Sequence, residues 1–290
     1  MTPSLASHLS LYGIRHFETD EYWDWASGKL GEKKARELDG LRDKVTKRCA
    51  KKHPRDVKIF YDAVADPEIA PIILSMKADA MRASGQAVSE RLAGRKNILD
   101  LGCGIGCLST WYARHAQARV TGVDFSEAGI ARAGQMATKL KVKNARFLVW
   151  DLCTIPHRAN RAVQQERAPD RRLIRQPPLL GQFDAVVDTQ TLSTVQNILR
   201  ALVNIKLCLA PGGVLISVPV LETARHARAY IRCLEGAGFR LHAFDFIQYA
   251  DCGNRGAYPV LTASLQGKSI RVQLEKEYEK IWQYLNPGDL

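Results

Sequence analysis

The stretch ILDLGCGIGCLST, residues 98–110, runs from an apolar segment through three alternating glycines into a segment of helical character. Glycines that follow a strand leave no side chain between the backbone and a ligand, so the ligand can approach closely. A helix that begins directly after such a loop adds unpaired N–H groups and the positive end of its dipole. The stretch therefore predicts a ligand-binding loop, for a dinucleotide, a phosphate or another group.

The spacing of the glycines separates these ligands. Gly102, Gly104 and Gly106 form GxGxG, whereas a dinucleotide fingerprint places its third glycine one residue later, where Cys107 stands. A phosphate-binding P-loop carries a lysine after its last glycine, and no lysine follows here. The spacing therefore disfavours a nicotinamide dehydrogenase and a P-loop enzyme.

From residue 96 onward, short apolar runs alternate with helical segments, which is the pattern of an α/β fold with a parallel sheet covered on both faces. The expected strands are Asn97–Leu101, Arg119–Val123, Ala145–Trp150, Phe183–Asp188 and Val214–Val218, and the expected helices begin near Cys107, Ser126, Ser193 and Glu222. After Gly238 two further apolar runs, FRLHAFDFI and AYPVLTASL, predict an antiparallel pair at the sheet edge.

The residues before and after this alternating part have helical patterns. After Gly31 apolar residues recur every three or four positions as far as Cys49, and Pro54 is expected to end that helix. Asp66 is a plausible N-cap for a helix that runs to about Leu92. We expect three parts: a helical N-terminal cap over 1–94, a ligand-binding core over 95–268 with a basic insertion loop at 156–182, and a C-terminal helix within 269–290.

Acidic residues stand at the ends of the expected strands. Asp100 precedes the glycine loop, Asp124 closes the second strand and Asp151 closes the third. A carboxylate at the end of the second strand can accept hydrogen bonds from two ribose hydroxyls, each worth about 1.5–3 kcal/mol. Asp151 suits an adenine amino group. Asp184 begins the fourth strand, so we interpret it as structural.

In this order the loop, the acids and the turn in LAPGGVLISV resemble the class I S-adenosylmethionine-dependent methyltransferases, of the type that acts on small molecules. The resemblance covers about residues 96–220. It implies a Rossmann-like, seven-stranded, mostly parallel sheet with an antiparallel terminal hairpin, methyltransferase activity, and S-adenosyl-L-methionine as cofactor. The residues implied for cofactor binding are Tyr61, Asp100, Gly102, Cys103, Gly104, Gly106, Asp124, Phe125, Ser126, Asp151, Leu152, Asp188 and Thr189.

The acceptor side of the expected site is defined by fewer residues. Tyr12, Tyr22 and Trp23 belong to an aromatic stretch ahead of the sheet, and such rings can cover a planar substrate or a sulfonium. The competing interpretation is that these rings pack in the core. Gln190, just after the fourth strand, is implied by the resemblance to face the substrate.

Two histidines are candidate general bases. His16 lies in the aromatic stretch and His226 follows the fifth strand, and histidine suits proton transfer near neutral pH. An exposed or capping histidine is the simpler interpretation of each. Ser193 and Thr194 stand where related quinone-type methyltransferases carry a Glu-His pair, so that pair's acid-base chemistry is not carried over.

The cysteines do not indicate a metal site. The chain has 7 cysteines and no CxxC pair, which favours free thiols in a reducing, cytoplasmic setting. Cys103 and Cys107 are four residues apart, but the third ligand of a cluster-binding motif would fall at Thr110. We therefore expect both cysteines to be packing residues.

The positive charge of the chain is local. The formal net charge is +12, and most of it lies in residues 29–58 and 157–182. No apolar run reaches the roughly 18–20 residues that cross a bilayer, so no membrane span is expected.

Methyl transfer to O, N or C of a small aromatic or specialised metabolite is the leading hypothesis. An RNA or protein methyltransferase that uses the two basic segments, and a non-catalytic cofactor-binding scaffold, remain alternatives. The oligomeric state stays open.

Overall fold

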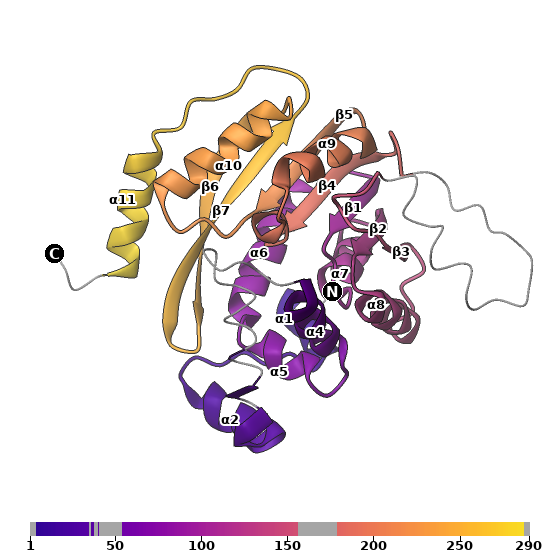
Figure 1. Ribbon diagram of the computed structural model, residues 1–290, viewed down its shortest axis with the longest axis vertical. Helices are drawn as coiled ribbons and strands as arrows, with labels where there is room; N and C mark the ends of the chain where they lie inside the picture. The colour runs from indigo at the N-terminus through magenta and orange to yellow at the C-terminus, as the bar shows by residue number, and fades with distance from the viewer. Residues whose placement is uncertain (1–3, 35, 38–39, 41–53, 156–178, 287–290) are drawn as a thin grey trace, which may run out of the picture.

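The computed structural model describes residues 4–34, 36–37, 40, 54–155 and 179–286. The strands in these residues form one mixed sheet in the order β3-β2-β1-β4-β5-β7-β6 (Figure 1). Only β7 runs against the others, because it pairs antiparallel with both β5 and β6. The strands are β1 (Asn97–Leu101), β2 (Arg119–Asp124), β3 (Ala145–Val149), β4 (Phe183–Thr189), β5 (Leu209–Val218), β6 (Arg240–Asp251) and β7 (Asn254–Ser264).

Helices cover both faces of this sheet, as Figure 1 shows. One face carries α6 (Ala78–Arg91), α7 (Cys107–His115) and α8 (Glu127–Lys139), and the other carries α9 (Ile198–Cys208), α10 (Ala224–Gly236) and α11 (Leu274–Leu285). Other helices of the described residues are α1 (Leu5–Ser10), α2 (Glu21–Leu30), α4 (Pro54–Ala65), α5 (Ala70–Ser75) and the 3₁₀ turn η2 (Leu192–Thr194), and residues 32–34, 36–37 and 40 are helical as well.

Strand β1 explains why the central strands have continuous apolar sequences. Ile98 packs in the core beneath α6 and α7, while Leu99 and Leu101 pack in the core beneath α9 and α10. Successive residues of a strand face opposite sides, so a strand that is buried on both faces needs apolar residues at every position. The five predicted parallel strands are confirmed, and four of them differ from the prediction by at most one residue at an end. The fifth, β5, begins at Leu209 and not at Val214, because Leu209 already pairs with Phe183 ahead of an irregularity in the register.

The glycine loop lies at the centre of the sheet. It follows β1, which is flanked by β2 on one side and β4 on the other, so the strand order reverses at this point. In open α/β sheets, ligands bind outside the carboxyl ends of the strands at such a reversal. The fold therefore places residues 102–106 where a ligand is expected.

The predicted antiparallel pair is confirmed as a long hairpin of β6 and β7, with β7 inserted between β5 and β6. Its turn consists of Cys252 and Gly253, whose φ angles are 50° and 78°. Two positive φ angles give a type I′ turn, whose twist matches that of the flanking strands. The Cys252 N–H donates to the carbonyl of Phe17, which fixes the hairpin tip to the N-terminal segment.

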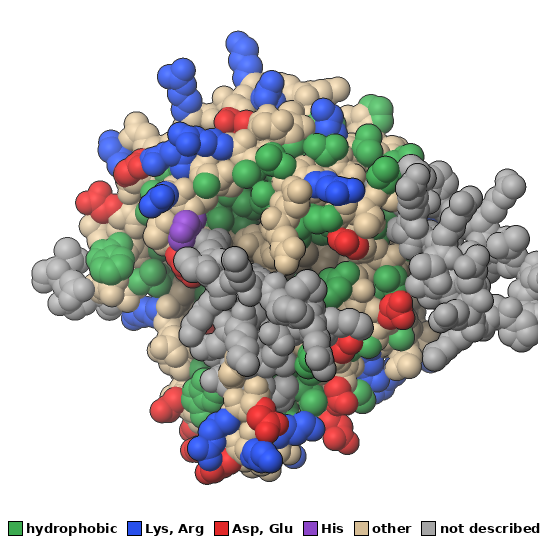
Figure 2. Space-filling model, viewed as in Figure 1, with side chains coloured by type: hydrophobic (Ala, Val, Ile, Leu, Met, Phe, Trp, Pro, Cys, Tyr) green, Lys and Arg blue, Asp and Glu red, His purple; other side chains and the backbone are tan. Residues whose placement is uncertain are grey.

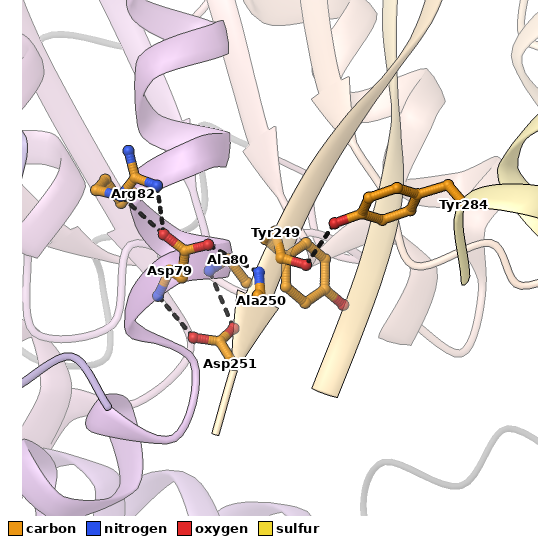
Figure 3. Close-up of polar contacts among 7 residues, drawn as sticks. All are labelled: Asp79, Ala80, Arg82, Tyr249, Ala250, Asp251 and Tyr284. Carbon is orange, nitrogen blue, oxygen red and sulfur yellow. Dashed lines mark hydrogen bonds and ion pairs between the residues drawn. The ribbon is translucent and has the colours of Figure 1, made fainter. Parts of the chain in front are cut away.

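The helix predicted from Asp66 to about Leu92 is wrong in its continuity. Asp66 Oδ1 accepts the N–H groups of Glu68 and Ile69, as a cap would, but α5 ends at Ser75 and α6 begins afresh at Ala78. The start of α6 is stabilised from the hairpin tip, because Asp251 accepts the N–H groups of Asp79 and Ala80 (Figure 3). Asp79 in turn accepts the N–H of Ala250 at 2.8 Å. These reciprocal bonds let the chain break after α5.

Other predictions differ in detail or cannot be compared. The helix expected near Ser193 is the short η2, and α9 begins only at Ile198, where Asn197 caps it. Pro54 begins α4 rather than only ending the helix before it. Most of the helix expected after Gly31, and residues 156–178 of the insertion expected at 156–182, lie outside the described residues. The N-terminal residues Leu5, Leu9, Tyr12 and Ile14 share the core of the sheet, so this part of the expected N-terminal cap packs directly onto the domain.

Candidate active site

The three loop glycines have different surroundings. All three have positive φ angles, 62°, 52° and 80° for Gly102, Gly104 and Gly106. A Cβ at Gly102 would lie 2.1 Å from Thr191 Oγ1, and one at Gly106 would lie 2.9 Å from the Ala133 Cβ. A Cβ at Gly104 would meet nothing within 4 Å. Gly102 and Gly106 therefore meet neighbouring side chains, and Gly104 is the loop glycine with open space beside it.

Asp124 holds the glycine loop from the end of β2. Its Oδ2 accepts the N–H of Gly104 and its Oδ1 accepts the N–H of Ser126, both at 2.9 Å. Burial raises the pKa of this carboxyl, and the backbone N–H donors oppose that rise. Two carboxylate oxygens offer about four acceptor sites, so capacity remains for the hydroxyls of a ribose.

Helix α4 spans the space above Asp124. The Tyr61 ring lies edge-on to Phe125 with 5.4 Å between centroids, and its hydroxyl lies near Thr194. Ser126, which caps α8 by accepting the Gly129 N–H, also donates to Asp62 Oδ1 at 3.1 Å. These contacts join α4 to the ends of β2 and β4. Phe125 stays exposed beside them and offers an apolar face.

Beneath the loop lies a group of buried polar side chains. Asp100 accepts a 2.5 Å hydrogen bond from Ser109, and burial raises its pKa to about 7, with the charges of Asp188 and Asp124 adding to the rise. The Tyr112 hydroxyl lies near Thr189, yet neither oxygen reaches a hydrogen-bond partner within the described residues. A buried hydroxyl without a partner costs free energy, so this group of residues fits a polar ligand end such as an amino acid.

The sequence pointed to Asp100 and Thr189 but not to Ser109 and Tyr112. Both missed residues lie on α7 within a run of buried positions. A polar residue on the buried side of a helix needs a hydrogen-bond partner. The polar residues on the buried side of α7 could therefore have indicated that Ser109 and Tyr112 belong to a site. Thr191, whose Oγ1 donates to the carbonyl of Leu101, was also missed, and only the fold brings it to the loop.

The structure corrects the prediction for Asp188. Its Oδ1 accepts the N–H groups of Thr191 and Leu192, and its Oδ2 accepts the hydroxyls of Ser217 and Tyr230. The side chain is fully buried and its acceptor sites are used inside the protein. Asp188 therefore braces the turn after β4 and does not face a ligand.

Gln190 follows β4 in a strained backbone conformation. Its φ angle is 66°, which is uncommon for a residue other than glycine, and its N–H donates to the carbonyl of Val218 at 2.8 Å. Strained residues of this kind cluster at ligand sites, where the surrounding structure holds them. The substrate role that the resemblance implies for Gln190 stays a prediction.

The remaining predicted cofactor residues are placed as follows. Asp151 is exposed at the end of β3, where its Oδ1 accepts the N–H of Cys153 at 2.9 Å. Leu152 points into the core, and the Cys103 sulfur packs against Gly122. Burial raises the pKa of the Cys103 thiol well above its usual value, as befits a packing residue. The Leu152 side chain is therefore used in the core, whereas Cys103 is partly exposed.

The aromatic residues predicted for the substrate are used in packing. The Tyr12 hydroxyl donates to the carbonyl of Gly106 and lies 2.6 Å from Thr110 Oγ1. The Tyr22 hydroxyl donates to the carbonyl of Ile72 within a small aromatic cluster. Both rings are buried, so the structure does not support a substrate role for Tyr12 or Tyr22. Trp23 is exposed on α2 with its ring 5.1 Å from that of Tyr22.

The two candidate bases lie on different elements. His16 is exposed, and its charge opposes the burial that raises the pKa of Asp251 at the hairpin tip. His226 is in the first turn of α10, where its N–H donates to Thr223 Oγ1. Their catalytic roles stay predictions. The described residues contain no group of three or more His, Cys, Asp or Glu that could hold a metal ion, and no described helix is long and apolar enough to cross a membrane.

Comparisons with known proteins fit this geometry. The family model described as a methyltransferase domain matches residues 93–238. An uncharacterized RNA methyltransferase of Nitratidesulfovibrio vulgaris is 29% identical over 97 residues, which are 33% of this chain and 20% of that relative, so the match spans about a fifth of its length.

Two solved structures share the fold. The [4+2]-cyclase SpnF aligns with a TM-score of 0.54 and 18% identity over 75% of this chain and 97% of its own. A complex between the Haloferax volcanii Trm112 methyltransferase activator and the putative methyltransferase aligns with a TM-score of 0.50 and 15% identity, over 78% of this chain and 92% of that chain. The predicted Rossmann-like fold is confirmed.

Proposed function

This chain belongs to the methyltransferase-domain family, and on that premise we propose that it transfers the methyl group of S-adenosylmethionine to a small-molecule acceptor held between α4 and the carboxyl edge of the sheet. The recognition of a class I S-adenosylmethionine-dependent methyltransferase, drawn from the loop and the strand-end acids, is confirmed. The positions of cofactor and acceptor that follow are our assignments.

The described residues fit the cofactor at three points. The free acceptor sites of Asp124 suit the two ribose hydroxyls, and the exposed ring of Phe125 suits the adenine face. The Asp100 carboxylate suits the ammonium of the cofactor's methionine end. In that position the ammonium and carboxylate of the cofactor would lie within reach of the unpartnered hydroxyls of Tyr112 and Thr189. These unpartnered hydroxyls are the observation that carries the assignment, because the protein alone leaves them unsatisfied.

The catalytic demand on this site is positioning. S-adenosylmethionine, when bound, supplies a methyl group that is already activated by the positive charge on sulfur. The protein must orient the acceptor in line with that bond and exclude water, and positioning of this kind supplies about 7–11 kcal/mol. We assign Gln190, directly after β4, and Tyr61, on the second half of α4, to the border of the expected methyl position.

The enclosure by α4 favours a small acceptor. Contacts from Tyr61 to Phe125 and from Asp62 to Ser126 hold this helix over the end of β2. A polymer needs an open groove, whereas the helix that these two neighbouring residues hold over the end of β2 narrows the way in, which favours a small acceptor. The finer alternative, an RNA acceptor, is supported by the similarity to the RNA methyltransferase, and most of its basic segments lie outside the described residues.

Methyl transfer from labelled cofactor in a cell extract tests the proposal. After incubation, the extract is separated into small molecules, protein and RNA, and label in the small-molecule fraction is expected. Label in RNA or protein alone would replace the proposed acceptor class. No label in any fraction, together with tight binding of S-adenosylhomocysteine, would favour a non-catalytic scaffold.

A further inference from the structure

Helix α9 exposes a row of apolar side chains on its outer side. Leu199, Val203 and Leu207 recur every four residues, and each is 48% exposed. Leu180 and Ile155, at 39% and 38% exposed, lie beside them. The Gly181 N–H donates to the carbonyl of Leu207, and the Asn204 amide donates to the carbonyl of Thr154, which fixes both neighbours against the helix. We call these five residues the α9 patch.

The α9 patch is more than scattered surface hydrophobicity. Single exposed apolar residues are common, whereas contiguous ones mark interaction sites. Of the eleven large hydrophobic residues exposed in the described part of the chain, five belong to this patch. The inner side of α9 already packs Leu202 and Ile205 in the core, so the patch is a second apolar face.

Positive charge borders the α9 patch. Arg200 and Lys206 are exposed on α9, which has no acidic residue. On the neighbouring α10, Arg232 and Glu235 are exposed, and Glu235 precedes Gly236, where a Cβ would lie 3.7 Å from Leu199, so the border is positive in balance but not throughout. None of the three basic residues takes part in an ion pair within the described residues. In Figure 2, hydrophobic side chains lie among Lys and Arg side chains over the region of α9 and α10.

The charges decide between the possible occupants. A second copy of the chain would bring its own Arg200 and Lys206 against this rim, and like charges facing each other across an interface are costly. Residues 157–178, the part of the insertion before Leu180, have six arginines and two acids, so their charge has the same sign. A partner that carries both apolar and acidic side chains complements the apolar row and the positive charges beside it.

We propose that the α9 patch binds an acidic amphipathic helix of another protein. Apolar residues at the i, i+4 and i+7 positions of that helix would meet Leu199, Val203 and Leu207, which span about 12 Å along α9. Aspartates and glutamates beside them would meet Arg200 and Lys206. The proposal does not depend on methyl transfer, because it concerns the outer side of α9 and not the carboxyl edge of the sheet.

Two synthetic peptides test the proposal. Each is an amphipathic helix of about 18 residues with leucines at i, i+4, i+7 and i+11, and the flanking residues are glutamates in one and lysines in the other. Fluorescence anisotropy with the full chain is expected to show the glutamate peptide binding at least about tenfold more tightly. The double substitution Leu199→Ser/Leu207→Ser should abolish that preference. The matched control Leu11→Ser/Ile270→Ser, at equally exposed apolar positions, should preserve it.

Charge reversal gives a test that does not disturb the apolar packing. The variant Arg200→Glu/Lys206→Glu should prefer the lysine peptide. The proposal is overturned by equal binding of the two peptides, by binding of neither, or by a preference that survives charge reversal. It is also overturned if sedimentation shows a dimer of the full chain that Leu199→Ser/Leu207→Ser dissociates, since the occupant is then a second copy. Circular dichroism confirms that each variant is folded.

Discussion

The pH dependence of cofactor binding should report the state of Asp100. Burial raises the pKa of this carboxyl from its usual value to about 7, and its only hydrogen bond among the described residues comes from Ser109. If the carboxylate holds the ammonium of the cofactor, it must be ionised when the cofactor binds. Affinity for S-adenosylhomocysteine, the product that keeps the same amino acid end, should therefore rise as the pH passes through 7.

The size of the effect follows from the pKa. With a pKa of about 7, roughly a tenth of Asp100 is ionised at pH 6 and roughly nine tenths at pH 8. The dissociation constant should fall about tenfold over this range, which is about 1.4 kcal/mol. Asp100→Asn removes the titration, so its affinity should vary less with pH and should be lower at pH 8, by the about 1.5–3 kcal/mol of a charge-assisted bond.

Isothermal titration calorimetry at constant ionic strength measures both proteins between pH 5.5 and 8. The ligand's own amino group titrates near the upper end of this range, and it affects the wild type and the Asn variant alike, so their difference isolates the side chain. A thioether adenosine without the amino acid end should bind with no such pH dependence. A flat wild-type profile, or a slope that Asp100→Asn retains, would refute the assignment of Asp100 to the ammonium.

Four further outcomes are expected. Asp124→Ala should weaken S-adenosylhomocysteine binding more than about tenfold, and an unchanged dissociation constant in calorimetry would show that the acid of β2 has been misassigned. Gly104→Ala should reduce cofactor affinity and lower the free energy of unfolding by about 1 kcal/mol, because the space beside Gly104 is open but its φ angle is positive. Gly102→Ala should lower the melting temperature more than Gly104→Ala does, because the added Cβ would lie 2.1 Å from Thr191 Oγ1. Asp251→Ala should lower the free energy of unfolding by about 1–2 kcal/mol in urea titrations at pH 7, since two N–H groups at the start of α6 lose their acceptor. Asp100→Asn should stabilise the cofactor-free protein at pH 8 by up to about 4 kcal/mol and have little effect near pH 4. The reason is that burial raises the pKa of the Asp100 carboxyl from 3.8 to about 7, so the folded protein loses stability as the pH rises through that range. Equal effects at both pH values in thermal melts would contradict this.

The sheet could be predicted from the sequence because its strands are apolar at consecutive positions and are separated by helices. The break between α5 and α6 could not be predicted in the same way. The cap of α6 comes from Asp251, 172 residues further along the chain than Asp79, and a local pattern of residues contains no trace of that contact. A continuous helical periodicity was therefore compatible with two helices.

The loop glycines show the same limit at the candidate site. Sequence reasoning treated Gly102, Gly104 and Gly106 alike because their spacing is regular. Their roles differ only through residues that the fold brings to them, Thr191 from the turn after β4 and Phe147 from β3. The acids at the strand ends also differ from each other. Asp124 retains acceptor sites for a ligand, whereas four donors of the protein occupy the acceptor sites of Asp188.

Three carboxyls meet at the carboxyl ends of β1, β2 and β4 without a basic partner. Asp100, Asp124 and Asp188 are buried, burial raises the pKa of each, and none forms an ion pair within the part of the chain that the structure describes. Buried charges are costly unless they are paired, and the surplus of lysines and arginines in this chain lies elsewhere. A cofactor with a positive sulfonium and a positive ammonium supplies the missing charge. Its binding should therefore lower the pKa of Asp100 and release protons. The protonation state of the site then depends on whether the cofactor is bound as well as on the fold.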